Sequence, residues 1–289
     1  MPAWPDRAAV HELPAGGATP VRRCIAVLMA VYARDDPALF ARALRSVLDQ
    51  HLEREVQIHF YLGIDGPIAA ALEAVIGANA SRLHQIVRNP TSIGLAATLN
   101  RLIAARGSEA YFFRMDSDDY SLPHRFQSQL DFLAANPEID IVGTDIVEVD
   151  TLAGTRRRVH FCDGPDHARR MICRRVPVAH PSVCMRAGVF DRVGGYPNRP
   201  GNEDIAMWFK CLRAGLRFGN VAEPLLEFSV APTFWQRRGL DKSLGEFRAY
   251  TEGIHALWGW NWRLMFPFAR LGLRLMPRTV KRVAYSLRR

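Results

Sequence analysis

Three acidic residues stand close together in the segment DSDD, directly after an apolar run. Residues two apart in an extended chain point the same way, so Asp116 and Asp118 can aim both carboxylates at one point. Hard oxygen ligands of this kind suit Mg²⁺ or Mn²⁺, which usually bind substrate phosphate oxygens as well. The pair therefore predicts a metal site that neutralises a departing diphosphate. The alternative is an acidic turn that caps the next helix, a role that Asp119 or Ser121 can fill alone.

Other polar residues stand where strands are expected to end. Asp65 closes an alternating run, and its carboxylate either accepts the N3–H of a pyrimidine base or belongs to an ordinary Asp-Gly-Pro turn. Asn89 precedes a helix expected to begin near Leu95, whose free N–H groups can face a diphosphate, although Asn-Pro is equally a common start of a turn. Arg114 is either a phosphate ligand or the buried partner of a neighbouring aspartate.

A second acidic pair, Glu203 and Asp204, begins an expected helix directly after Pro-Gly-Asn. Acids in a first helical turn are favoured by the helix dipole, which is a sufficient structural reason for both. The functional interpretation is a general base that removes a proton from an acceptor hydroxyl during in-line attack. A partly buried carboxylate beside a second acid has a raised pKa, which suits a base.

The order of strands and helices indicates how these residues are positioned. The apolar run 24–32 predicts a strand buried on both faces, Asp36-Pro37 predicts a helix start, and residues 56–64 alternate as one strand. Further helices are expected near 68–78, 95–106, 123–135, 166–173 and 203–214, and further strands near 83–88, 110–115, 139–147, 157–162 and 183–186.

This alternation predicts an α/β fold with right-handed βαβ units and a mainly parallel central sheet. Ligands of such sheets bind at the carboxyl ends of the strands. With 289 residues, the chain fits one large domain with appendages. We expect a flexible arm at 1–22, a domain at 23–232 with a nucleotide-binding half to 150 and an acceptor half from 151, and a helical tail at 233–289.

The basic charge of the chain is concentrated in this tail. The net charge is +9, and residues 233–289 alone hold 12 Lys or Arg against 3 Asp or Glu. Such a tail can bind nucleic acid or an anionic membrane. Nucleic acid is the weaker hypothesis, because the aromatic residues stand among long aliphatic ones. Three tryptophans, Trp258, Trp260 and Trp262, come first. Two series at helical spacing follow: an apolar one of Leu264, Phe268, Leu271 and Leu275, and a basic one of Arg270, Arg274, Arg278 and Arg282.

We therefore predict two short amphipathic helices, divided by Pro267 and Pro277, that lie in the plane of a membrane surface. The alternative is that they fold back onto the main domain. No apolar run is long enough to span a bilayer, residues 1–22 lack the apolar centre of a signal peptide, and the five cysteines show no metal or disulfide spacing. The expected location is cytoplasmic, peripheral at the inner face of the cytoplasmic membrane.

Taken together, nine well-spaced motifs resemble glycosyltransferase family 2, whose members have the GT-A fold. The resemblance covers about residues 24–230. The motifs are AVYARDD (30–36), LRSVLDQ (44–50), GIDG (63–66), RNPTSIGLAATLNRLIAA (88–105), RMDSDDYSLPHRFQSQLDFL (114–133), IDIVGT (139–144), HPSVCMR (180–186), GGYP (194–197) and NEDIAMWFKCLRAG (202–215).

The resemblance implies an inverting enzyme that takes a sugar from a nucleotide diphosphate donor, by default UDP, to a saccharide or lipid-linked acceptor. In that scheme Asp116 and Asp118 hold Mn²⁺ or Mg²⁺ and the diphosphate, Asp65 contacts the base, and Asp204 is the catalytic base supported by Glu203. The remaining donor-side positions are Asn89, Arg114 and the backbone at Tyr32, and the sugar or acceptor side would include His180, Arg186 and Trp208.

Two other interpretations use the same residues. A nucleotidyltransferase can share the sheet and the acidic metal site, but phosphoryl attack does not need the acids at 203 and 204. A non-catalytic carbohydrate-binding or assembly protein on a transferase fold is the other alternative, and the intact acids argue against it. The sugar, the acceptor and the linkage are not specified by the sequence, and dTDP-rhamnose and GDP-mannose are further candidate donors.

Overall fold

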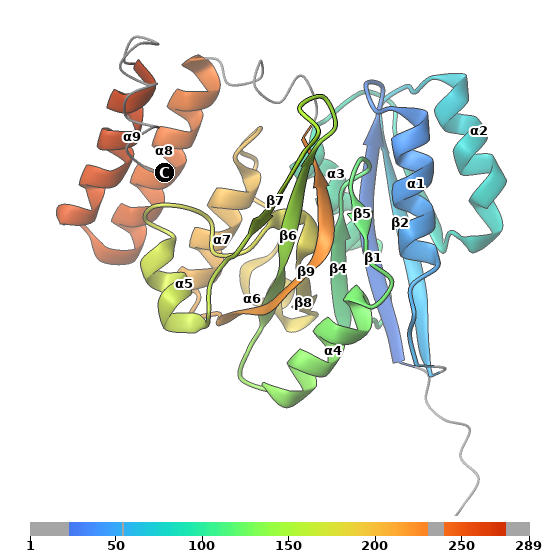
Figure 1. Ribbon diagram of the computed structural model, residues 1–289, viewed down its shortest axis with the longest axis horizontal. Coiled ribbons are helices and arrows are strands. Elements are labelled where there is room, and N and C mark those ends of the chain that lie inside the picture. The colour runs from blue at the N-terminus through green and yellow to red at the C-terminus, as the bar shows by residue number, and fades with distance from the viewer. Residues whose placement is uncertain (1–22, 54, 231–239, 276–289) are drawn as a thin grey trace, which may run out of the picture.

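The computed structural model describes residues 23–53, 55–230 and 240–275. In this part of the chain, nine strands form one sheet (Figure 1). They are β1 (Arg23–Tyr32), β2 (Val56–Asp65), β3 (Gln85–Asn89), β4 (Tyr111–Met115), β5 (Tyr120–Ser121), β6 (Ile141–Asp150), β7 (Thr155–Val159), β8 (Cys184–Arg186) and β9 (Phe218–Ser229). The α-helices are α1 (Pro37–Leu48), α2 (Ala70–Asn79), α3 (Leu95–Ala104), α4 (Arg125–Ala135), α5 (Pro165–Met171), α6 (Gly188–Val193), α7 (Glu203–Arg213), α8 (Leu240–Trp258) and α9 (Met265–Leu275).

The strand order is β3-β2-β1-β4-β8-β6-β9-β5, with β7 paired to β6. The first four strands run parallel, as do β6 and β9, whereas β8, β5 and β7 pair antiparallel with their neighbours. The predicted α/β domain with a largely parallel sheet is therefore confirmed. Register aligns the carboxyl ends, because Tyr32 is paired with Asp65 and Asp65 with Asn89.

Helices cover both faces of the sheet and bury two hydrophobic cores. On one face α1, α2 and α4 pack against alternate residues of β1 and β2, and Phe60, Leu62 and Ile64 face this core as the alternation predicts. On the other face lie α3, α6, α7 and α8. Gly63 faces α3 so closely that a Cβ there would lie 2.4 Å from Thr98 Cγ2. Small size at this position lets the helix that follows β3 approach the sheet.

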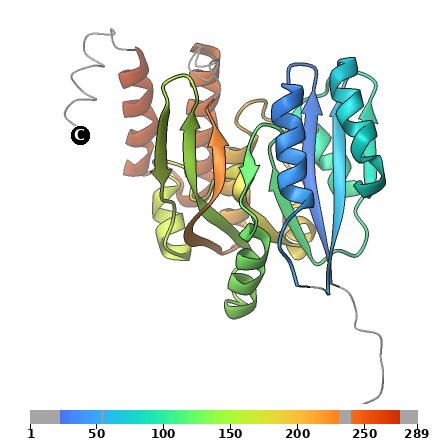
Figure 2. The same ribbon diagram turned by 45° about the vertical axis from the view of Figure 1, so that its right-hand side comes forward.

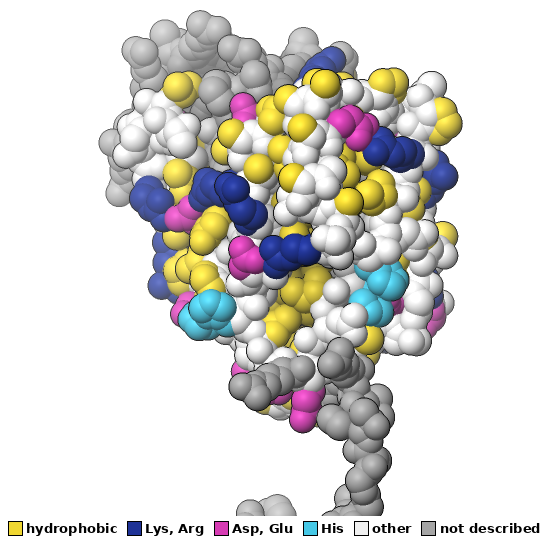
Figure 3. Space-filling view, turned by 90° about the vertical axis from the view of Figure 1, so that its right-hand side faces the viewer, with side chains coloured by type: hydrophobic (Ala, Val, Ile, Leu, Met, Phe, Trp, Pro, Cys, Tyr) yellow, Lys and Arg dark blue, Asp and Glu magenta, His cyan; other side chains and the backbone are white. Residues whose placement is uncertain are grey.

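Local sequence signals account for several element ends. The Asp36 carboxylate accepts hydrogen bonds from the N–H groups of Ala38 and Leu39, which fixes the start of α1 where Asp-Pro predicts it. Acidic and basic side chains adjoin on the face shown in Figure 3, and the ion pairs around α2 include Arg88–Glu73 and Arg82–Asp49. Such ion pairs agree with the charge balance of residues 1–232, which are formally neutral because the tail alone accounts for the net charge of +9.

The sequence analysis does not contain β5, α6 or β9, and the longest of these is β9, in a region with little regular pattern. It is 12 residues long and pairs in parallel with β6. Its register shifts near Asp145, which is paired with Pro224. A proline and this irregularity break the alternation by which a strand is recognised. This strand joins β6 to β5, and its last residue, Ser229, lies beside the DSDD segment.

The C-terminal helices α8 and α9 lie side by side, on the opposite side of the molecule from α2 (Figures 1 and 2). Helix α8 packs against α7, with Tyr250 and Ile254 buried and with Gly253 placed where a Cβ would meet the Phe209 ring at 2.2 Å. The alternative that the tail folds back onto the domain thus holds for α8 and, through α8, for α9. None of the helices within the described ranges has the length and apolarity needed to cross a membrane.

Two details of the predicted tail are wrong. Leu264 is buried, and the Arg270 guanidinium is bound to Glu246 and to the carbonyl of Arg174, so neither belongs to an outward-facing stripe. Pro267 does not divide two helices, because it occupies the first turn of α9, where a proline costs little. The expected arm at 1–22, the boundary at 232 and the residues from Pro277 onward lie outside the described residues.

Candidate active site

The DSDD segment directly follows the carboxyl end of β4, as the sequence predicts. One carboxylate oxygen from each of Asp116, Asp118 and Asp119 lies within 4.8 Å of the others. Burial and the negative charges of Asp116 and Asp35 raise the pKa of Asp118 to about 6. Burial together with Asp116 and Asp118 raises the pKa of Asp119 well above its usual value. Carboxylates that repel one another in this way fit a divalent cation, which would relieve the repulsion.

Asp119 is held differently from the other two acids. It is 1% exposed, and one of its oxygens accepts a hydrogen bond of 2.9 Å from the Ser229 N–H at the end of β9, while the Ser229 hydroxyl donates to the Asp118 carbonyl. The second oxygen of Asp119 is buried without a hydrogen-bond partner. The alternative of a helix cap is wrong, because α4 begins at Arg125 with no side-chain cap and Ser121 lies in β5.

Arg114 is a buried cation beneath these acids. Its guanidinium forms an ion pair with Asp116 while 1% of the residue is exposed. Its positive charge opposes the rise in pKa of Asp118 and Asp119, and also that of Asp204. The interpretation of Arg114 as the buried partner of an aspartate is therefore confirmed. Two of its nitrogens, Nε and Nη1, have no hydrogen-bond partner in the described structure.

Asp35 joins the site, although the sequence analysis does not single it out. Its carboxylate accepts hydrogen bonds from the Tyr32 N–H at 3.0 Å and from the Ser117 hydroxyl at 2.8 Å, so it links the end of β1 to the DSDD segment. Asp35 could have been identified from the sequence, because it follows the end of a predicted strand by three residues. The same reasoning, that ligands bind at the carboxyl ends of strands, identifies Asp65 and Asp116. Tyr32 lies where predicted, in the row of residues that end the parallel strands.

Asp65 orders the loop between β3 and α3. Its carboxylate accepts four hydrogen bonds, from the Ile93 and Gly94 N–H groups, the Ser92 hydroxyl and the Asn89 amide, at 2.7–3.0 Å. Burial raises the pKa of Asp65, but these hydrogen bonds outweigh it and hold the pKa below its usual value. Asp65 thus fixes the loop that leads into α3, the helix whose amino end the sequence predicts to face a diphosphate.

Asn89 belongs to the same network. Its amide donates to Asp65 and to the Thr98 hydroxyl at 2.8 Å, and its carbonyl oxygen accepts from Arg101. The side chain is buried and its hydrogen-bonding capacity is largely used inside the loop. A direct contact of Asp65 or Asn89 with a nucleotide stays a prediction, and the visible role of both residues is to position the loop.

The second acidic pair begins α7, as expected. Burial and the adjacent Glu203 raise the pKa of Asp204 to about 6, against the opposing charge of Arg114. Asp204 is therefore ionised at neutral pH and still basic enough to accept a proton near that pH. The Arg114 charge acts on this carboxylate and on the acids after β4, so one buried guanidinium influences the pKa of both acidic groups.

His180 and Trp208 lie beneath the site and point into the core. The His180 ring is 8% exposed, its Nε2 is 3.1 Å from the Tyr196 hydroxyl, and it meets Trp208 edge to face. Burial and the charge of Arg114 lower the pKa of His180 well below its usual value, so the imidazole is neutral. Trp208 is fully buried against Phe218. Both are packing and positioning groups in this geometry.

Arg186 lies away from these residues. It pairs with Tyr111 at the amino end of β4, whereas the DSDD segment follows the carboxyl end. Its guanidinium donates to the carbonyls of Leu133 and Ile139 at 2.7 and 2.8 Å, which anchors the end of α4. The geometry gives Arg186 a structural role, and we leave it out of the site.

The fold and the acids define the class of protein. The sequence profile described as Glycosyl transferase family 2 matches residues 26–193, which is more than half of the chain. The chain therefore belongs to glycosyltransferase family 2 and is a transferase. A relative from Escherichia coli, named UDP-Gal:alpha-D-GlcNAc-diphosphoundecaprenol beta-1,3-galactosyltransferase, is 26% identical over 265 residues, which cover 90% of this chain and 94% of the relative.

Solved structures show the same architecture. S. aureus TarS 1-349 in complex with UDP-GlcNAc matches with a TM-score of 0.64 at 13% identity, over 86% of this chain and 70% of that chain. The mannosyltransferase PcManGT from Pyrobaculum calidifontis, in complex with GDP-Man and Mn²⁺, matches with a TM-score of 0.58 at 14% identity, over 91% of this chain and 78% of that chain. At such identities the likeness establishes the fold, which is the expected GT-A arrangement.

Proposed function

We propose that the protein transfers a sugar, with inversion, from a nucleoside diphosphate donor to a hydroxyl of a saccharide or lipid-linked acceptor. The observation that carries this proposal is the group of three carboxylates directly after β4, together with a fourth carboxylate at the start of α7 on which the charge of the buried Arg114 also acts. UDP is the proposed nucleotide, in line with the donor in the name of the E. coli relative and the ligand of TarS.

Asp116 and Asp118 would hold Mn²⁺ or Mg²⁺, and the buried orphan oxygen of Asp119 supports a cation nearby. Such an ion supplies a positive charge for the diphosphate oxygens. Arg114 orients Asp116 through their ion pair. The loop fixed by Asp65 presents the amino end of α3, whose N–H groups favour an anionic ligand.

Asp204 is the proposed general base. Its carboxylate removes the proton from the acceptor hydroxyl as that oxygen bonds to the anomeric carbon. The bond from this carbon to the diphosphate oxygen breaks at the opposite side, so the configuration inverts. The proton resides on Asp204 and the electron pair leaves with the nucleoside diphosphate. Glu203 supports the reaction by raising the pKa of its neighbour.

The donor is identified by a thermal-shift panel of nucleotide sugars with Mn²⁺. A donor at 100 times its Kd stabilises the fold by about 2.7 kcal/mol. We expect a UDP-sugar to give the largest rise in Tm, and to give it only when Mn²⁺ is present. No rise with any nucleotide sugar would contradict the proposal. Release of pyrophosphate instead of a nucleoside diphosphate would point to a nucleotidyltransferase.

We further propose that the tail binds the inner face of the cytoplasmic membrane through the outer face of α9. The exposed residues of this face share an apolar character and the i, i+3, i+4, i+7, i+8 spacing of one helix stripe: Met265, Phe268, Ala269, Gly272 and Leu273. Trp260 and Trp262 extend it and are 83% and 60% exposed. Exposed tryptophan beside a basic segment is typical of binding to an anionic lipid interface.

This attachment would place the enzyme beside a lipid-linked acceptor, such as the one in the name of the E. coli relative. The test is flotation of the full chain with liposomes that contain anionic lipid. The double substitution Met265→Glu/Leu273→Glu should abolish flotation, because it places two charges on the stripe. Leu152→Glu is the matched control, since Leu152 is 74% exposed but lies in the β6–β7 turn. If the double variant floats as well as the Leu152→Glu control, the membrane proposal is wrong, and the catalytic proposal is unaffected.

A further inference from the structure

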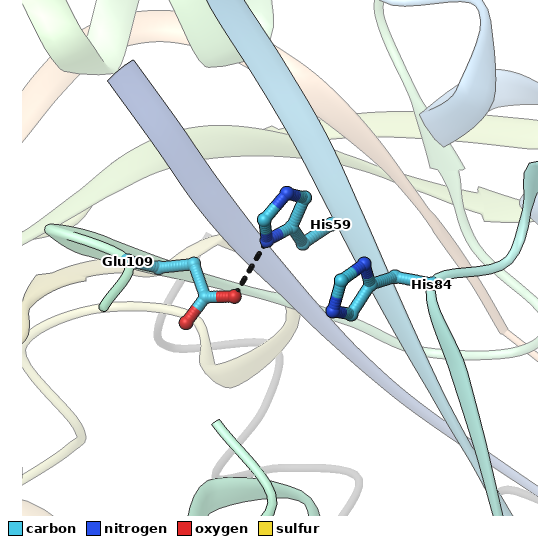
Figure 4. A group of neighbouring side chains, drawn as sticks. All are labelled: His59, His84 and Glu109. Carbon is cyan, nitrogen blue, oxygen red and sulfur yellow. Dashed lines mark hydrogen bonds and ion pairs between the residues drawn. The ribbon is translucent and has the colours of Figure 1, made fainter. Parts of the chain in front are cut away.

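Two histidines and a glutamate form a cluster at the amino ends of the parallel strands, away from the candidate active site. His59 lies in β2, His84 directly precedes β3, and Glu109 lies two residues before the start of β4. Figure 4 shows the three side chains pointing toward one another. His59 and Asp65 are six positions apart on the same strand, so about 20 Å separates the cluster from the carboxyl ends.

The geometry brings three metal-ligating atoms together. His59 Nδ1 lies 2.7 Å from a Glu109 carboxylate oxygen. The rings of His59 and His84 stack with their centroids 4.0 Å apart and their planes 7° from parallel. One ligand atom from each of the three residues lies within 4.8 Å of the others. The imidazole nitrogens of histidine are common ligands of divalent transition metals.

Glu109 is a buried carboxylate that a neighbouring hydroxyl orients. It is 3% exposed, and the Tyr61 hydroxyl donates a hydrogen bond of 2.6 Å to the oxygen that faces His59. Its other oxygen is buried without a hydrogen-bond partner. A buried carboxylate oxygen without a partner is costly unless a cation or donor satisfies it.

We propose that His59, His84 and Glu109 bind a divalent transition-metal ion, with Zn²⁺ as the reference species. Two imidazoles and a carboxylate are a known zinc ligand set, whereas Mg²⁺ and Mn²⁺ prefer all-oxygen sites such as the acids after β4. Tetrahedral zinc with bonds of about 2.0–2.2 Å brings ligand atoms to roughly 3.3 Å from one another, so the group must contract slightly. His84 is exposed and can rotate, while Tyr61 keeps the carboxylate oriented.

The ion would join β2, the start of β3 and the segment before β4, so it would stabilise the nucleotide-binding half without taking part in transfer. This proposal does not rest on the proposed function. It predicts that Zn²⁺ raises the Tm of the metal-free full chain in the presence of excess Mg²⁺, which occupies the carboxylate cluster.

The test is equilibrium dialysis of the EDTA-treated full chain against Zn²⁺ with excess Mg²⁺, followed by measurement of zinc per chain. His84→Asn removes the exposed ligand without disturbing the core, and His124→Asn is the matched control, because His124 is an exposed histidine that packs edge to face on His51. We expect one zinc in wild type and in His124→Asn, and none in His84→Asn.

A third variant, Asp118→Asn, separates the two metal groups. It should retain the zinc, and Co²⁺ in place of zinc should give the visible absorption of a nitrogen-ligated ion in this variant and not in His84→Asn. No zinc on the wild-type chain, equal zinc on His84→Asn, or loss of zinc from Asp118→Asn would each overturn the proposal.

Discussion

Replacing Asp204 with asparagine separates catalysis from stability. A positioned general base typically contributes about 10²–10⁴ to the rate, so Asp204→Asn should lose most of its turnover. It should not lose stability. The pKa of Asp204 is about 6 in the folded protein, against a usual value of 3.8, so ionising it costs the folded state free energy. This difference in pKa corresponds to a cost of roughly 3 kcal/mol as an upper limit.

The direction of the pH effect follows from this sign. The unfolded chain loses the proton near pH 4 and the folded chain near pH 6, so the folded state loses stability as pH rises through this window. Asparagine removes that loss. The variant should therefore melt at a higher temperature than wild type at pH 7, and at about the same temperature at pH 3.

The pH–rate profile provides the assay. With a pKa of about 6 for Asp204, wild-type kcat should be near its plateau at pH 7 and fall by about a factor of ten at pH 5. Saturating Mn²⁺ is needed, because the pKa of Asp118 is also about 6 and a bound cation keeps that carboxylate ionised. Nucleoside diphosphate release reports the rate, with acceptor supplied as a crude lipid extract.

Glu203→Gln is the matched comparison. It removes the neighbouring negative charge, so the pKa of Asp204 should fall and the acidic limb should move to lower pH while activity at pH 7 is retained. An inactive Glu203→Gln beside an active Asp204→Asn would reverse the roles. An Asp204→Asn protein that is inactive because it melts below wild type at pH 7 would refute the electrostatic argument.

Three further substitutions test the framework around the site. Asp65→Asn should weaken UDP binding in a titration and lower stability by about 1–3 kcal/mol, because the loop before α3 loses charge-assisted hydrogen bonds; unchanged binding would contradict its positioning role. Gly253→Ala should cost about 1–3 kcal/mol in a denaturant melt through collision with Phe209, whereas Gly272→Ala, with open space around it, should not destabilise. Arg186→Met should lower Tm but leave kcat unchanged below the melting range, and a lower kcat in a fully folded variant would return Arg186 to the site.

The fold was largely predictable because its first half follows regular patterns. Strands β1 and β2 are read directly from a continuous apolar run and an alternating one. Asp65 marks the carboxyl end of β2, and Asp116 directly follows β4. The predicted start of α1 rests on Asp36-Pro37, because an aspartate cap and a proline at the first helical position indicate the same helix start. Strand β9 was not predictable in the same way, since Pro224 and a register shift interrupt its alternation.

The site was predictable where chemistry is local to one segment. The carboxylates of Asp116 and Asp118 share a strand end, so spacing alone brings them together. The contact of Ser229 with Asp119 depends on β9, which arrives from 110 residues away, and no local pattern announces it. The inward side of the tail was misjudged for a related reason. Helical spacing assigns Leu264 and Arg270 to outward-facing stripes, but Leu264 is buried in the 3₁₀ turn before α9, and Arg270 pairs with Glu246 of α8.

The most direct test of the central claim is donor turnover measured as free nucleoside diphosphate, with and without metal. We predict that the full chain releases UDP from a UDP-sugar with Mn²⁺, that EDTA stops the release, and that added Mn²⁺ restores it. Asp118→Asn should fold normally and release none under the same conditions. Full release after thorough metal removal, or equal release by Asp118→Asn, would contradict the assignment of the acids after β4 as the centre of a metal-dependent sugar transfer.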